Sequence, residues 1–169
     1  MSDRKNNGLP AIGLVKEELA KTGAEELPVF IKKYQWDERT GVKKLVETAE
    51  KRYEKLQKEI ARTENLKKYE KEYDNYTYIA GIDEVGRGPL AGPVVACAVI
   101  LPKDCDILYI NDSKQLSAAK REELYDIIME KAVAVGIGMD GPDRIDEINI
   151  LQATYEAMRQ AITQLTPQP

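Results

Sequence analysis

Helical periodicity dominates the sequence up to a point near residue 75. Residues 42–73 contain neither glycine nor proline, and their apolar side chains recur at spacings of three and four. These side chains fall on one stripe of a helix, and they are Val46, Ala49, Tyr53, Leu56, Ile60 and Thr63. The pattern predicts a long helix over this stretch, and shorter helices are expected over residues 12–20 and 30–36.

The long helix is rich in lysine and glutamate around a narrow apolar stripe, which leaves three interpretations open. In the simplest one, the stripe packs against a neighbouring helix. In the second, the basic residues follow a nucleic-acid backbone, although interleaved glutamates weaken this idea. The residues in question are Lys43, Lys44, Lys51, Arg52, Lys55 and Lys58. The third interpretation is a dimeric coiled coil, for which the stripe is short.

After residue 75 the pattern becomes that of an α/β domain. The predicted order is strand, strand, helix, strand and helix, over residues 78–83, 94–101, 117–132, 133–139 and 143–165. The second strand is apolar almost throughout, so we expect it to be central and covered on both faces. Ser117 and Asp143 are the predicted helix N-caps, and Tyr155, Met158 and Ile162 are expected in the core of the last helix.

Length and composition allow one ordinary domain with an appendage. The 169 residues are 43% apolar and 32% charged, and we expect a helical N-terminal extension over residues 1–75 and a second domain over 76–169. No apolar run approaches the about 20 residues that cross a bilayer, so no membrane partner is expected. The two cysteines, Cys97 and Cys105, form neither a disulfide framework nor a zinc motif, which favours a reducing cytoplasm.

Charge is unevenly distributed along the chain. The formal net charge is −4, with 17 Lys+Arg against 15 Asp+Glu in residues 1–78 and 8 against 14 in residues 79–169. Bound cations could offset the acidic half, but net charge alone decides nothing about function.

The most informative chemistry follows the first predicted strand. Asp83 and Glu84 are adjacent carboxylates that lead directly into Gly86-Arg87-Gly88. Adjacent carboxylates repel each other unless a cation neutralises them, and Mg²⁺ and Mn²⁺ favour carboxylate oxygen. Glycines let backbone N–H groups approach a phosphate, and an arginine adds a positive group suited to phosphate.

Three segments in order carry a family resemblance. The first, Asp83-Glu-Val-Gly-Arg-Gly88 with the following Pro89-Leu-Ala-Gly-Pro-Val-Val95, resembles the signature of bacterial ribonuclease HII, the type 2 ribonuclease H. Asp112-Ser-Lys-Gln-Leu-Ser117 resembles a second segment, in which the family usually has lysine at position 115. Asp146-Glu-Ile-Asn-Ile150 resembles a third, and the similarity covers residues 66–165.

The resemblance implies a fold and an activity. The fold would be the N-terminal half of a ribonuclease H-like mixed α/β sheet with flanking helices, preceded by the helical extension. The activity would be endonucleolytic hydrolysis of the RNA strand of RNA–DNA hybrids, including single ribonucleotides embedded in duplex DNA. The site would be a two-metal carboxylate site that uses Mn²⁺ or Mg²⁺.

The resemblance also implies roles for individual residues. Asp83 and Glu84 would be catalytic and would be two of four acidic metal ligands. Because successive strand residues point to opposite faces, both reach one site only if the strand bends or ends at Glu84. Gly86, Arg87 and Gly88 would contact the junction between ribonucleotide and deoxyribonucleotide, although a tight turn would also favour glycine.

Two further segments have weaker expectations. Ser113 and Lys114 would bind phosphates of the DNA strand, although Asp112 and Ser113 could merely shape a turn. Asp146, Glu147 and Asn149 are expected to cap or decorate a helix rather than to bind metal.

The sequence departs from the family at its end. The other two acidic ligands lie later in the family, and this sequence stops at Pro169. We therefore expect the first strand to be an open sheet edge. We also expect this chain alone to be weakly active or inactive, acting at most as a module that binds RNA–DNA hybrids.

Overall fold

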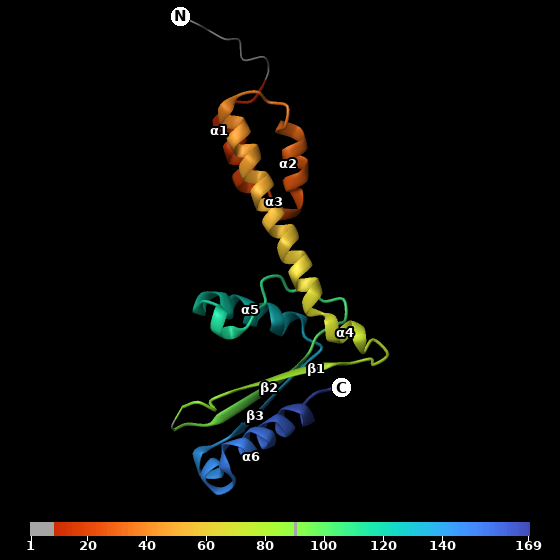
Figure 1. Ribbon diagram of the computed structural model, residues 1–169, viewed down its shortest axis with the longest axis vertical. Helices are drawn as coiled ribbons and strands as arrows, with labels where there is room; N and C mark the ends of the chain where they lie inside the picture. The colour runs from red at the N-terminus through yellow and green to blue at the C-terminus, as the bar shows by residue number, and fades with distance from the viewer. Residues whose placement is uncertain (1–8, 90) are drawn as a thin grey trace, which may run out of the picture. The chain divides into compact units, whose positions relative to one another are not determined.

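The computed structural model describes residues 9–89 and 91–169, so residues 1–8 of the expected extension and Leu90 of the signature lie outside the described residues. The chain divides into two compact units, Met1–Arg62 and Thr63–Pro169, which are described separately (Figure 1). Within the described ranges, no helix has both the length and the apolar character needed to span a membrane.

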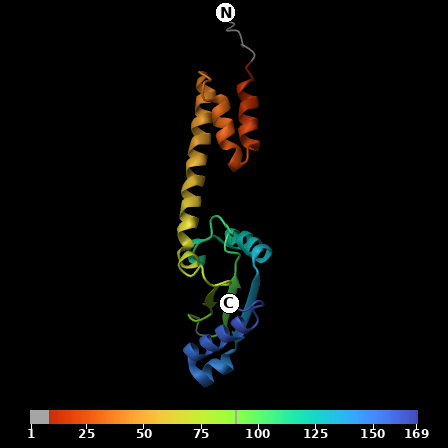
Figure 2. The ribbon, with the colours of Figure 1, turned by 90° about the vertical axis from the view of Figure 1, so that its right-hand side faces the viewer.

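The first unit is a small helical bundle. Helices α1 (Ile12–Lys21), α2 (Leu27–Tyr34) and the greater part of α3 (Thr40–Leu66) lie side by side (Figure 2), with a short 3-10 turn, η1, at Ala24–Glu26. Their shared core consists of Val15, Leu19, Leu27, Phe30, Tyr34, Val42, Val46 and Ala49. The predicted helices are therefore present, and the apolar stripe of the long helix packs against its own chain.

The predicted long helix is divided in the structure. Helix α3 ends at Leu66, and a separate helix, α4 (Lys68–Glu72), follows after Lys67. Along the stripe of α3, Leu56 and Thr63 are also buried, whereas Ile60 is 42% exposed. The stripe therefore continues beyond the bundle core with one exposed member.

The second unit contains a three-stranded antiparallel sheet. Its strands are β1 (Ala80–Val85), β2 (Val94–Ile100) and β3 (Ala134–Asp140), in the order β1-β2-β3. A 3-10 turn, η2 (Ser113–Gln115), and helix α5 (Ala118–Lys131) connect β2 to β3, and α6 (Pro142–Thr163) follows. The predicted order of strands and helices is confirmed, and β1 lies at an edge of the described sheet.

Helix α6 covers one face of this sheet at very close range. Ala153, Ala157 and Ala161 of α6 are fully buried against it. A methyl group on Gly136 or Gly138 of β3 would overlap the carbonyl oxygens of Ala161 and Ala157, respectively. On β2, every second residue faces α6 and is fully buried, while those between are half-buried. We expected both faces of β2 to be covered, but only the face under α6 is fully buried.

Two predictions about the last helix are wrong. Gly141, not Asp143, is the N-cap of α6, and Asp143 lies in its first turn. Tyr155 and Ile162 are exposed, because the glycines of β3 admit only the alanine stripe of the helix, whereas Met158 is half-buried and packs against the core as expected.

A kink at Asn149 divides α6 into two helical segments. Asn149 has a φ of 68°, and its Oδ1 accepts hydrogen bonds from the backbone N–H groups of Leu151 (3.0 Å) and Gln152 (3.1 Å). Arg144 joins the segments by donating to both carboxylate oxygens of Glu156, at 2.8 and 3.1 Å. Asn149 therefore caps the second segment, in agreement with the expected helix-capping role.

Two glutamines of α6 bind the outer edge of β3. Gln164 donates to the carbonyl oxygen of Ile137 (2.7 Å) and accepts from its N–H (3.4 Å), and Gln160 accepts from the N–H of Met139 (3.0 Å). Both backbone groups of a residue in an antiparallel strand point to the same side. These groups therefore point away from β2, and side chains occupy the positions that a further strand would use.

Candidate functional site

The two adjacent carboxylates lie on opposite faces of the sheet. Strand β1 continues to Val85, with Asp83 opposite Cys97 and Glu84 opposite Ala96 on β2. Because Ala96 belongs to the face buried under α6, Glu84 lies on that face and Asp83 on the other. Strand β1 ends at Val85, one residue after Glu84, so the two side chains start from opposite faces at the end of the strand.

The surroundings of the two carboxylates differ. Asp83 is exposed, and its Oδ1 accepts a hydrogen bond from the backbone N–H of Glu84 at 2.9 Å. The Glu84 side chain is 21% exposed, and its Oε1 accepts from Nη1 of Arg87 at 3.2 Å. Arg87, which the resemblance assigns to the nucleic-acid backbone, is thus hydrogen-bonded to Glu84, while the Asp83 side chain is exposed to solvent.

The two glycines of the loop have different physical roles. Gly86 has a φ of 97°, and a Cβ there would overlap the carbonyl oxygen of Pro93, so the turn itself requires glycine. Gly88 is exposed, and a Cβ there would meet no atom within 4 Å. The turn therefore requires glycine at position 86, whereas at Gly88 the backbone is exposed and a side chain would be accommodated.

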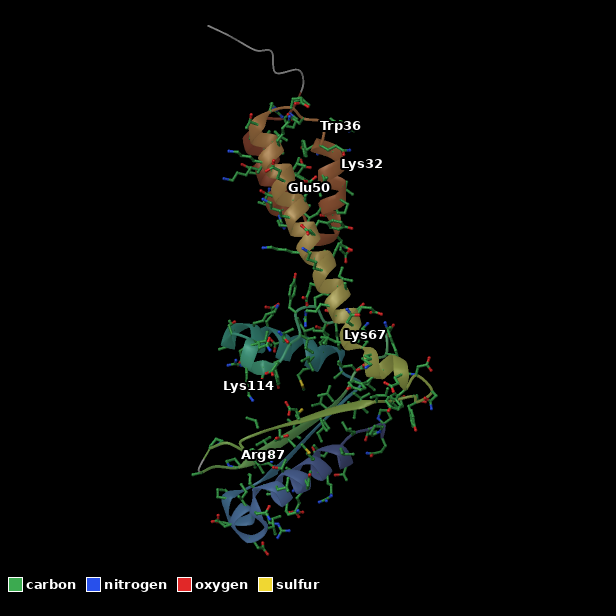
Figure 3. The ribbon with its side chains drawn as sticks, viewed as in Figure 1. Lys32, Trp36, Glu50, Lys67, Arg87 and Lys114 are labelled. Atoms are coloured by element: carbon green, nitrogen blue, oxygen red, sulfur yellow. The ribbon has the colours of Figure 1, made fainter. Side chains whose placement is uncertain are left out.

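Ser113 and Lys114 lie in the turn η2 ahead of α5. Asp112 caps this turn, because its Oδ1 accepts from the backbone N–H of Lys114 at 2.9 Å. The carbonyl oxygen of Ser113 accepts from Arg121 of α5 at 3.1 Å. Both predicted phosphate contacts have exposed side chains, and Figure 3 shows that of Lys114 projecting from this segment. Asp112 shapes the turn, and the side chain of Lys114 is exposed to solvent.

The described residues do not form a metal site on their own. Within residues 9–89 and 91–169, no group of three or more His, Cys, Asp or Glu side chains could hold a metal ion. Mg²⁺ and Mn²⁺ prefer several oxygen ligands arranged around one point. Asp83 and Glu84 supply two carboxylates, which start from opposite faces of β1, and Glu84 pairs with Arg87.

The structure shows two features on the sheet face of Asp83 that the sequence did not reveal. Cys97 lies directly across from Asp83, and burial raises the pKa of its thiol. On the same sheet face, Gly81 and Val99 line a cavity of about 380 Å³ that extends to Asn111 and Asp112. The alternation of the two strands could have indicated the Cys97 contact once their register was known. The cavity could not be predicted, because its walls come from segments far apart in the chain.

Comparison with known proteins gives a consistent picture for both parts of the chain. A family model described as ribonuclease HII matches residues 80–169, and one described as ribonuclease HII N-terminal domain matches residues 11–74. The chain is 71% identical over 133 residues to a ribonuclease HII from Lachnoclostridium phytofermentans, covering 79% of this chain and 52% of that protein. It is 50% identical over 161 residues to one from Listeria monocytogenes, covering 94% and 61%.

A solved structure, the ribonuclease H2 from Pyrococcus horikoshii, also matches. Its TM-score is 0.43 at 29% identity, and the match covers 54% of this chain and 46% of that one. The chain thus spans between half and two thirds of the length of the curated relatives named above.

Proposed function

Because the chain belongs to the ribonuclease HII family, we propose that it supplies catalytic carboxylates and substrate-binding loops to an endonuclease that hydrolyses the RNA strand of RNA–DNA hybrids. The family is one of hydrolytic nucleases. The observation that carries the proposal is the family match over residues 80–169. The match includes every residue assigned to the site: Asp83, Glu84, Gly86, Arg87, Gly88, Ser113 and Lys114.

The proposed substrates include single ribonucleotides embedded in duplex DNA, with 3′-OH and 5′-phosphate ends as products. The 2′-OH is the group that distinguishes RNA from DNA, and it both donates and accepts hydrogen bonds. The exposed, unobstructed backbone at Gly88 supports close recognition of such a group. The exposed hydroxyl of Ser113 and ammonium of Lys114 suit phosphates of the DNA strand, whatever the base sequence.

We assign Asp83 and Glu84 to a larger acidic set that holds a pair of divalent ions, Mn²⁺ or Mg²⁺. Such ions would supply Lewis-acid stabilisation of the charge that develops on the phosphate. The exposure of Asp83 supports its part in this assignment. To bind the same ion as Asp83, the Glu84 carboxylate would exchange its Arg87 hydrogen bond for the ion.

A second candidate function is binding of RNA–DNA hybrids without cleavage by this chain. Two observations favour it. Asp83 and Glu84 lie on opposite faces of the sheet, and within the described residues no three His, Cys, Asp or Glu side chains cluster as metal ligands would. The loop at Gly88 and the Lys114 ammonium remain available for binding in that case.

We keep two further assignments as proposals. The boundary between an N-terminal domain and a nuclease domain is placed after residue 75, between the two family matches, whereas the compact units divide at residue 62. The proposed location is the cytoplasm, since Cys97 and Cys105 are free thiols.

The test uses the chain itself and three duplexes of one base sequence: an RNA–DNA hybrid, DNA with one ribonucleotide, and DNA alone. Binding is measured by fluorescence anisotropy, and cleavage with Mn²⁺ is followed on a denaturing gel. Cleavage at the ribonucleotide that Asp83→Asn abolishes supports the endonuclease. Preference for ribonucleotide-containing duplexes without cleavage supports the binding module, and equal affinity for all three duplexes without cleavage contradicts both.

A further inference from the structure

Positive charge is concentrated in the first unit of the protein. Residues 1–62 contain 14 Lys+Arg against 11 Asp+Glu, whereas residues 63–169 contain 11 against 18. A polyanion such as nucleic acid is therefore attracted by the helical unit and repelled on average by the unit that carries Asp83. A nucleic-acid contact outside the candidate site would therefore use exposed basic side chains of the helical unit.

Four lysines of α3 form a continuous basic ridge, defined here as Lys44, Lys51, Lys55 and Lys58. Their spacings of seven, four and three residues place them on one face of the helix. This face is opposite the one that packs in the bundle core, and all four residues are exposed. At 1.5 Å per residue, the ridge is about 21 Å long.

Most of the ridge is free of internal ion pairs. Lys58 pairs with Glu54 at 2.6 Å, but Lys44, Lys51 and Lys55 form no ion pair with any of the described residues. The two other basic residues that the sequence grouped with them are engaged elsewhere. Lys43 pairs with Glu38, and Arg52 donates to backbone carbonyl groups at the end of α1.

The acidic residues of α3 flank the ridge. Glu47 lies three residues after Lys44 and four before Lys51, and Glu54 lies three residues after Lys51 and four before Lys58, so both glutamates neighbour the lysine face. A bound polyanion would therefore follow the lysines and be kept from the glutamate side. The glutamates reduce the positive potential of the ridge, but they form no ion pair with Lys44, Lys51 or Lys55 within the described residues.

We propose that the basic ridge of α3 binds the phosphate backbone of duplex nucleic acid, as a second contact beyond the loop at Gly86–Gly88. The inference rests on the proposed function for the kind of nucleic acid. Phosphates of one strand follow each other every 3.4 Å along the duplex axis, so the ridge spans about six of them. Lysine is a flexible point charge, which suits contacts that do not depend on base sequence.

The test compares two triple variants of the full chain with equal loss of charge. The ridge variant is Lys44→Gln, Lys51→Gln and Lys55→Gln. The control is Lys16→Gln, Lys21→Gln and Lys32→Gln, which removes three exposed lysines of the same unit that also form no ion pair within the described residues. Lysine and glutamine have similar helix propensities, and unchanged melting temperatures will show that both variants fold.

Anisotropy titrations with DNA and with RNA–DNA hybrid are run at several salt concentrations. The ridge variant is expected to bind both duplexes about tenfold or more weakly at 0.1 M salt, with the slope of log K against log salt reduced by up to about 2.7, while the control changes less than about twofold. Equal losses in the two variants, or wild-type affinity in the ridge variant, overturn the inference, as does a wild-type chain that binds no duplex. Wild-type chain that binds hybrid and DNA equally and cleaves neither contradicts the proposed function and leaves the ridge result intact.

Discussion

Asp83 and Cys97 face each other across β1 and β2, so the side chain next to the exposed carboxylate is a half-buried thiol. The pair lies on the sheet face that α6 does not cover. The electrostatic environment of Asp83 therefore depends directly on what occupies position 97.

This relationship predicts a difference between two isosteric substitutions. Cys97→Asp places a second carboxylate opposite Asp83, and like charges directly opposite on neighbouring strands repel. We expect Cys97→Asp to be less stable than Cys97→Asn by about 1 kcal/mol in urea unfolding at neutral pH. Equal midpoints for the two variants would show that the side chains do not meet.

The close contact of α6 with β3 predicts opposite effects for two glycine substitutions. Gly138→Ala forces its methyl group against the carbonyl oxygen of Ala157, and we expect a loss of about 1–3 kcal/mol. Gly81→Ala in β1 is the matched control, because its methyl group would meet no atom within 4 Å. Its stability should stay the same or rise by about 0.5 kcal/mol in the same urea titration. A stable Gly138→Ala protein would mean that α6 lies farther from the sheet.

The loop glycines should separate folding from binding. Gly86→Ala combines an unfavourable positive φ with overlap on Pro93, so its melting temperature should fall. Gly88→Ala has room for its methyl group and should melt like the wild type. Under the proposed function, Gly88→Ala nevertheless loses affinity for ribonucleotide-containing duplexes, measured by anisotropy. Full affinity in that variant would remove Gly88 from the site.

Acid stability of the helical unit should depend on Asp37. Nearly buried, Asp37 accepts hydrogen bonds from Arg39 at 2.6 and 2.9 Å, and these hold the pKa of its carboxyl below the ordinary value. A lowered pKa in the folded state contributes stability that is complete above about pH 5 and is lost as pH falls below about 4.

The measurement is the melting temperature between neutral and acidic pH, followed by circular dichroism. Asp37→Asn should melt lower than the wild type at neutral pH, and the gap should narrow on acidification. A gap that stays constant with pH would assign the effect to packing and not to the charge of Asp37.

The glutamines at the edge of β3 should limit self-association. Gln164→Ala frees the N–H and C=O groups of Ile137, and unpaired strand edges recruit other strands. We expect a larger average mass in light scattering at high protein concentration. Gln152→Ala, an exposed residue of the same helix, serves as the control and should remain like the wild type. Identical scattering of the two variants would contradict the protective role.

Local patterns predicted the elements well, because each depends on residues close in sequence. The stripe at Val46 and Ala49 defined the long helix, and the alternation before Asp83 defined the first strand. The packing face of α6 could not be predicted in the same way. Ala157 and Met158 both belong to stripes with helical spacing, and the choice between them is made by the glycines of a distant strand.

The arrangement of the candidate site was predictable only in part. The sequence identified Asp83 and Glu84, and strand geometry showed that both reach one site only if the strand bends or ends at Glu84. The sequence did not show where β1 ends. The kink at Asn149 was equally hidden, because a single residue with positive φ leaves the apolar periodicity of the helix intact. Such features depend on tertiary contacts that a single sequence does not display.

Gln160 and Gln164 give the sheet one closed border. Within the described part of the chain, no helix provides corresponding bonds to β1 at the opposite border. A further strand could therefore pair with β1, whereas the side chains of Gln160 and Gln164 occupy the pairing positions of β3. A strand added there would make β1, the strand that carries Asp83, an interior strand of the sheet.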